Sequence, residues 1–190
     1  MTTGYSSEIF IRQFPIVRAF VYHLTYYRCL NKGYDKCGFD SEFWTHTIDA
    51  HLLQASINWC KVFGSDRQND IHWVKLNNNK HGELNLKFLL GLKTSCGIDL
   101  EEWKSYRKVI INFRNKFVAH TDLLFAAPVP SFDMALQVAF YYDIWIREII
   151  SPDYLAEGSL TLFSENLIRK MEIPLALVIT NSKTVLDGIE

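Results

Sequence analysis

The amino-acid sequence predicts an all-α fold, an antiparallel helical bundle of four long helices with short extra helices. Apolar residues recur every three or four positions along most of the chain, which is the spacing of one helix face. Glycine, proline and capping residues fall between these periodic segments and mark where helices begin and end. Because the connections between the long segments are short, neighbouring helices are expected to run in opposite directions.

The first half of the chain predicts two long helices and one short one. The first long helix begins at Pro15, which suits a first helical position, and ends at Gly33. The second has Ser41 as its N-cap and ends at Gly64. A polar connection rich in turn-forming residues follows, and a short helix is predicted from Leu84 to Leu92.

The second half predicts two more long helices. Asp99 and Glu102 form a capping box that opens the third. Its buried stripe consists of Trp103, Tyr106, Ile110, Phe113 and Phe117. The fourth runs from a cap at Ser131 to Ile150, and a shorter helix covers Leu160 to Lys170. For the tail, residues 171–190, the pattern leaves a strand and an extended segment both open.

Size and charge bound the class of protein. A chain of 190 residues is expected to form a single domain, residues 1–190. Lys and Arg total 20 against 21 Asp and Glu, for a formal net charge of -1. This balance gives no general attraction to nucleic acid or to an anionic membrane, so any site for a polyanion must be local.

Cysteine usage and hydropathy indicate a cytoplasmic protein. The chain has no C-x-x-C pair, and its size does not require disulfide staples. The four scattered cysteines are Cys29, Cys37, Cys60 and Cys96. Arg12, Pro15 and Arg18 interrupt the apolar N-terminal segment, so no signal peptide is expected. No run of about 18 uncharged apolar residues is present, so no membrane partner is expected.

The segment RNKFVAH, residues 114–120, ends the apolar pattern of the third long helix with two phosphate-binding residue types. On a continuous helix, Arg114 and His120 are separated by about 9 Å along the axis and about 120° around it. They therefore do not share a face. A distortion near Lys116 could bring them together, and so could a second copy of the chain related by a two-fold axis.

This segment resembles the R-x(4–6)-H motif of the HEPN superfamily, and its continuation to Asp122 resembles the abortive-infection branch of that superfamily. The resemblance implies a HEPN-like helical bundle that forms a homodimer. It implies a metal-independent endoribonuclease with RNA as substrate and no cofactor, acting as a toxin or phage-defence effector. A toxin would have a cognate antitoxin as a further partner.

The resemblance assigns catalysis to Arg114 and His120. Histidine exchanges protons near neutral pH, and arginine offers a permanent charge and a planar fork for phosphate oxygens. If the resemblance holds, Asn115 orients the phosphate or the histidine, and Lys116 adds positive charge or lowers the histidine pKa. The nearby carboxylate of Asp122 is the supporting group that could hold the histidine.

Three further basic residues of the same helix, Lys104, Arg107 and Lys108, lie outside the apolar stripe and could bind RNA as a local basic track. Other interpretations remain for the whole set. Helix C-termini favour Lys, Arg and His for electrostatic reasons alone. The alternative function is a non-catalytic HEPN-like module that binds RNA or a nucleotide, or that serves as a protein-interaction scaffold.

Three other features have structural explanations. His46 and His51 are five residues apart on different helix faces, so no metal site is expected. His72 and Trp73 could stack on a base, but such a pair in a loop more often anchors the loop on the core. Cys60 lacks the electropositive, exposed setting of a reactive thiol.

Overall fold

The computed structural model describes residues 5–35, 41–66, 69–76, 82–119, 128–149 and 158–187. All regular elements of these residues are helical, which confirms the predicted all-α bundle. The helices are α1 (Ser7–Tyr34), α2 (Glu42–Phe63), α3 (Glu83–Cys96), α4 (Leu100–Phe113), α5 (Asp133–Ile149) and α6 (Leu160–Asp187). A 3₁₀ turn, η1 (Trp73–Leu76), precedes α3, and a π-helical turn, η2 (Arg114–Ala119), continues α4.

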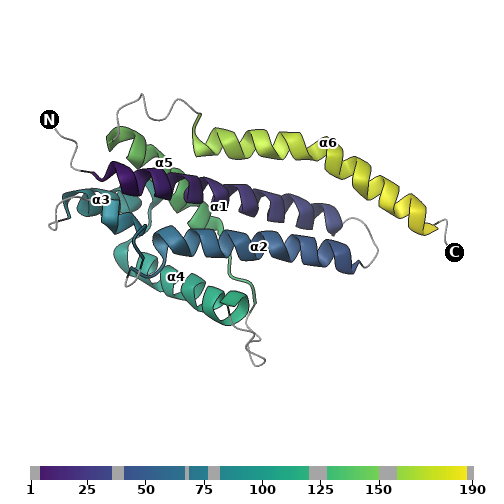
Figure 1. Cartoon of the computed structure of the whole chain (residues 1–190), viewed down its shortest axis with the longest axis horizontal. Helices are drawn as coiled ribbons and strands as arrows, with labels where there is room; N and C mark the ends of the chain where they lie inside the picture. The colour runs from purple at the N-terminus through teal and green to yellow at the C-terminus, as the bar shows by residue number, and fades with distance from the viewer. Residues whose placement is uncertain are drawn as a thin grey trace.

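Helix α1 is the central element of the bundle. Figure 1 shows it between α2, which runs antiparallel to it, and α6, which runs in the same direction as α1. Helices α3, α4 and α5 lie around the C-terminal half of α2 and the first half of α1 (Figure 1). The main core lies there and is rich in aromatic residues, with Trp59, Phe63, Phe88, Trp103 and Tyr142 among its fully buried side chains.

Several predicted helix ends are confirmed. The Asp99 carboxylate accepts hydrogen bonds from the backbone N–H groups of Glu101 and Glu102, both at 2.9 Å, and the Glu102 carboxylate accepts the Asp99 N–H at 2.9 Å. This is the expected capping box. Gly64 ends α2, and Ser41 stands at the N-cap of that helix, although its side chain makes no capping hydrogen bond.

The predicted start of the first helix at Pro15 is wrong. Helix α1 begins at Ser7, where the Ser6 hydroxyl accepts the Ile9 N–H at 3.4 Å, so Pro15 lies inside the helix. The added turns carry Phe10 and Phe14, which are both buried in the core. Their burial offsets the hydrogen bond that proline removes from the helix.

From residue 171 to Asp187 the tail forms neither a strand nor an extended segment, because α6 continues without interruption to Asp187. Met171 is buried against Leu30 and Ile48 in a second, small core cluster, and Leu175 packs on it one turn later. This contact with α1 keeps the chain helical although Pro174 lies within the segment. None of the helices in the described ranges is both long and apolar enough to span a membrane.

A buried hydrogen-bond network, here called the central polar network, connects four helices through Gln13, Gly64, His72, Arg107 and Tyr142. The Tyr142 hydroxyl of α5 donates to the Gln13 amide oxygen of α1 at 2.7 Å. The Gln13 amide nitrogen donates to the His72 carbonyl at 2.9 Å. The His72 ring and the Arg107 guanidinium both donate to the Gly64 carbonyl at the end of α2.

For two members of this network the sequence made a prediction, and the structure agrees with it for His72 only. His72 is only 1% exposed, so it anchors the connection on the core, as the structural interpretation predicted. Its Nδ1 accepts the Val74 N–H at 3.4 Å, which assigns the proton to Nε2, the atom 3.0 Å from the Gly64 oxygen. Arg107, by contrast, is half-buried and also donates to the Phe63 carbonyl at 2.8 Å, so it serves the end of α2.

Gly91 of α3 is expected to tolerate no side chain. A Cβ at this position would overlap the hydroxyl and ring of Tyr141 on α5, a residue that is itself buried. Gly91→Ala should therefore lower the free energy of unfolding by about 1–3 kcal/mol, although alanine is intrinsically the better helix former. Urea denaturation measures the change. Ser95→Ala, on the exposed surface of the same helix, is the matched control and should be neutral or slightly stabilising. A Gly91→Ala protein as stable as wild type would contradict this packing.

His72 should make the protein less stable in acid. Burial, assisted by the Arg107 charge, lowers the pKa of His72 from 6.5 to about 4. Between these values the unfolded chain binds more protons than the folded one, so stability is complete above pH 6.5 and falls as the pH drops toward 4. The loss from this group is about 3 kcal/mol at most. Urea denaturation of wild type and His72→Gln across this range measures it.

In that comparison, His72→Gln should be less stable at neutral pH but should show a shallower dependence on pH. Parallel curves for the two proteins would mean that His72 is not the group responsible.

Candidate functional site at the end of helix α4

Helix α4 carries the predicted motif and is firmly attached to the core. Trp103 is buried edge-to-face against Trp59 of α2, with ring centroids 5.8 Å apart. The Tyr106 hydroxyl donates to the Ser131 carbonyl at 2.8 Å and accepts the Ala135 N–H at 3.2 Å. These contacts fix the helix against both α2 and the start of α5, so its final turn has a defined position.

The helix changes geometry where the motif begins. Residues Arg114–Ala119 form the π-helical turn η2, in which backbone hydrogen bonds reach one residue further than in an α-helix. A distortion near Lys116 was one of the ways in which the sequence could bring Arg114 and His120 together. His120 and Asp122 themselves lie outside the described residues.

Arg114 is half-buried at the junction of α4 and η2. Its guanidinium lies close enough to the thiol of Cys60 on α2 for its positive charge to lower that thiol's pKa. Its Nε is shielded from solvent and has no hydrogen-bond partner among the described residues. A shielded, unpaired guanidinium nitrogen is unusual, because buried polar groups are nearly always hydrogen-bonded.

The Cys60 thiol beside Arg114 is not activated as a nucleophile. Burial raises the pKa of Cys60 to about 11, and the positive charges of Arg114 and Arg107 offset only part of that rise. The thiol is therefore protonated at neutral pH, as the sequence led us to expect. The proximity of Cys60 to Arg114 was not predicted, because the sequence around Cys60 does not indicate which residue of η2 lies next to it.

The other residues predicted to support catalysis or to bind RNA differ in exposure and in their contacts. Asn115 and Lys116 are exposed on η2, and Lys108 is exposed on α4. Lys104 is also at the surface, where its ammonium lies 2.8 Å from the Glu101 carboxylate. Arg107 lies apart from this exposed set, because its guanidinium is engaged in the central polar network.

An aromatic pair lies beside Arg114. The rings of Phe113 and Phe117 are stacked with centroids 5.2 Å apart, and Phe113 is in turn edge-on to Phe132. Phe113 is buried, whereas Phe117 is 46% exposed. The predicted buried stripe is thus correct as far as Phe113, and its last member faces outward.

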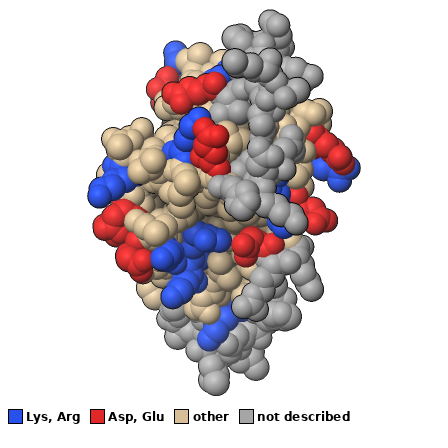
Figure 2. All heavy atoms as spheres, turned by 90° about the vertical axis from the view of Figure 1, so that its left-hand side faces the viewer, with Lys and Arg blue, Asp and Glu red and all other residues tan. Residues whose placement is uncertain are grey.

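Charges of both signs are interspersed at the end of the molecule where α1 begins, as Figure 2 shows. This agrees with the near-zero net charge of the chain. Among the coloured atoms of that face, basic and acidic side chains lie close to one another. Attraction of an anionic ligand must therefore come from a few residues and not from the surface as a whole.

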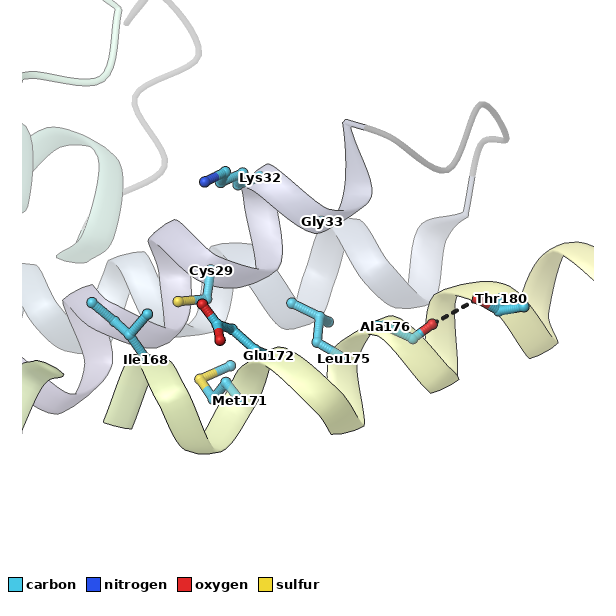
Figure 3. A pocket seen from close by; sticks show the side chains of 9 residues that line it. All are labelled: Cys29, Lys32, Gly33, Ile168, Met171, Glu172, Leu175, Ala176 and Thr180. Carbon is cyan, nitrogen blue, oxygen red and sulfur yellow. Dashed lines mark hydrogen bonds between the residues drawn. The ribbon is translucent and has the colours of Figure 1, made fainter. Parts of the chain in front are cut away.

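A groove of about 430 Å³ lies elsewhere, between the end of α1 and the second half of α6 (Figure 3). It is lined by Cys29, Lys32 and Gly33 of α1 and by α6 residues that include Met171, Glu172 and Leu175. Burial raises the pKa of the Cys29 thiol, so this cysteine also stays protonated. The groove contains none of the residues predicted to act in catalysis.

Among the described residues, no group of three or more His, Cys, Asp or Glu side chains is arranged to hold a metal ion. The described part of the candidate site thus consists of a half-buried arginine, a distorted helix end, two exposed polar side chains and an outward-facing phenylalanine. Comparisons of the chain with models of protein families, with curated proteins and with solved structures find no match.

Proposed function

We propose that this protein is a metal-independent endoribonuclease of HEPN type, which cuts single-stranded RNA by attack of a 2′-hydroxyl on the adjacent phosphate. The observation that carries the proposal is the π-helical turn across the motif, from Arg114 to Ala119. Turns of this kind are rare and are frequently found at functional sites.

The reaction requires three things of the site. A base must take the proton of the 2′-hydroxyl, an acid must protonate the leaving 5′-oxygen, and the added charge on phosphorus must be stabilised. His120 supplies proton transfer, and Arg114 supplies the charge and the planar fork for the non-bridging oxygens. Because Arg114 is already half-buried against Cys60, little side-chain freedom is lost when it binds a phosphate.

Exposed residues next to Arg114 extend this assignment. Asn115 orients the phosphate or the histidine, and Lys116 adds positive charge. Lys104 and Lys108 continue the basic track, since the surface pair between Lys104 and Glu101 is weak and yields readily to a phosphate. Arg107 drops out of the proposed RNA-binding set, because its donors are committed to backbone carbonyls.

The active form in this proposal is a homodimer whose two motifs share one cleft, where Asp122 helps to hold the histidine. A two-fold axis brings each Arg114 and His120 near those of the partner. The outward-facing Phe117 supports such an arrangement, because a half-exposed aromatic ring at the mouth of a site is typical of a protein interface. The biological role would be that of a cytoplasmic toxin or phage-defence effector, with a cognate antitoxin as a further partner.

A second candidate is a non-catalytic HEPN-like module that binds RNA or a nucleotide, or that serves as a protein-interaction scaffold. The contact between Arg114 and the Cys60 thiol favours it, because that contact gives the arginine a packing role that needs no chemistry. In this case the motif would hold a ligand or a partner without cleaving it.

The test is cleavage of a labelled structured RNA in excess chelator by wild type, His120→Ala and Arg114→Lys. Wild type should produce fragments with 2′,3′-cyclic phosphate ends. Both variants should lose activity by about 100-fold or more, the first because proton transfer is lost and the second because the planar fork is lost. The matched control is Arg169→Lys, an exposed arginine on α6, which should cleave like wild type.

Circular dichroism and oligomeric state should be checked for each variant. Salt-sensitive RNA binding by wild type without cleavage of any of a range of RNAs would support the scaffold and reject the nuclease. Equal cleavage by wild type and both motif variants would place the activity outside the motif.

A further inference from the structure

Two histidines that are far apart in the sequence meet between α1 and α2. His23 and His51 have their Nδ1 atoms 3.0 Å apart and their ring centroids 5.2 Å apart. Both side chains are half-buried, so the pair remains accessible from solvent. This contact arises only from the packing of the two helices, since His51 has no suitable partner within its own helix.

The two imidazoles are held in place by aromatic rings. Tyr26 lies against His51, with centroids 5.0 Å apart, and Tyr22 stacks on Tyr26 at 4.5 Å. Tyr22 also meets His23 edge-on, at 5.3 Å. These contacts hold the two imidazoles beside each other, with both Nδ1 atoms on facing sides of the rings.

The protonation state of the two histidines also favours binding of a cation. Burial lowers the pKa of both histidines, and the proximity of His23 lowers that of His51 further. Both rings are therefore neutral at pH 7, which is the state in which imidazole binds metals. In the described residues the two imidazole rings contact only aromatic rings and each other. Neither Nδ1 atom is hydrogen-bonded to a carboxylate or to a basic side chain.

We propose that His23 and His51 form a two-histidine site for a divalent late transition ion, with Zn²⁺ as the candidate, that cross-links α1 and α2. Two nitrogens bound to a tetrahedral zinc ion lie about 3.3 Å apart, and two adjacent nitrogens in a square-planar complex about 2.9 Å apart. The observed 3.0 Å separation lies between these values. In the hydrogen-bonded pair the two Nδ1 atoms point at each other, so each ring must turn by about 35–45° to direct its lone pair at a shared ion. Water molecules complete its coordination.

Protons balance without an external acid or base. In the metal-free pair, one Nδ1 carries the proton of the hydrogen bond and the other accepts it. When the ion binds, the donor histidine shifts its proton to Nε2, and both Nδ1 lone pairs become ligands. At neutral pH each imidazole keeps one proton, so binding releases none. In acid the ion must displace protons and binds more weakly.

The site would act on the stability of the helical hairpin and not on RNA cleavage. An ion that binds the folded chain and not the unfolded one stabilises the fold in proportion to the logarithm of its concentration over Kd. Since the two histidines come from different helices, the unfolded chain does not present them together. The site is independent of the proposed nuclease function and can be tested on the inactive protein.

The test is the thermal unfolding midpoint of the full chain, first freed of metal and then titrated with zinc chloride and, separately, with nickel chloride. The unfolding midpoint of wild type should rise by about 5 °C or more when the zinc concentration is 100-fold above Kd. His23→Gln and His51→Gln should each lose that rise, measured against their own metal-free midpoints. His46→Gln is the matched control, since it removes an exposed histidine of the same helix, and it should respond like wild type.

A second measurement separates binding from any destabilisation caused by the substitutions. Electron paramagnetic resonance of bound Cu²⁺ should show coupling to two imidazole nitrogens in wild type and in His46→Gln, and to fewer in the other two variants. An equal midpoint rise in all four proteins, or no rise in wild type, would overturn the proposal, as would a Cu²⁺ spectrum that is unchanged in His51→Gln.

Discussion

The carbonyl of Gly64 is the constraint on which the rest of the structure depends. It ends α2, and it accepts hydrogen bonds from both the His72 ring and the Arg107 guanidinium. Through the backbone of residue 72, the same network reaches Gln13 of α1 and Tyr142 of α5. Because a buried polar group left unpaired costs more than its hydrogen bond contributes, each member holds the others in place. The α4 helix is therefore positioned by polar contacts as well as by its apolar stripe.

The two arginines of α4 and η2 illustrate what that positioning does. Arg107 and Arg114 are seven residues apart, close to two turns of about 3.6 residues each, so they lie on the same side of the helix. That side faces the end of α2, where Arg107 meets the carbonyls of Phe63 and Gly64 and Arg114 meets the Cys60 thiol. The hydrogen bonds of Arg107 to these two carbonyls stabilise the fold. Arg114 retains a shielded nitrogen without a described partner, at the point where the helix becomes π-helical.

Helix α1 organises the remaining elements. Its first half packs into the aromatic core, its middle meets α2 through the His23 and His51 pair, and its end supports α6 through Leu30 and Met171. Both helices that contain an internal proline, α1 and α6, are held by such contacts. The burial of several apolar side chains along a helix outweighs the single backbone hydrogen bond that a proline removes. For this reason helix α1 extends back beyond the predicted start at Pro15, and α6 continues beyond the predicted end at Lys170.

The sequence by itself determined the all-α class, the capping box at Asp99, the end of α2 at Gly64 and the apolar stripe of α4, because each depends on spacing within one helix. It also indicated that the apolar pattern of the helix ends near Arg114, where η2 begins. Only the tertiary structure decided that Arg107 binds backbone carbonyls, that Arg114 meets Cys60, that residue 171 onward stays helical and that His23 meets His51. These features join residues on different helices, and their distances follow from how the helices pack, which no periodicity along one chain segment encodes.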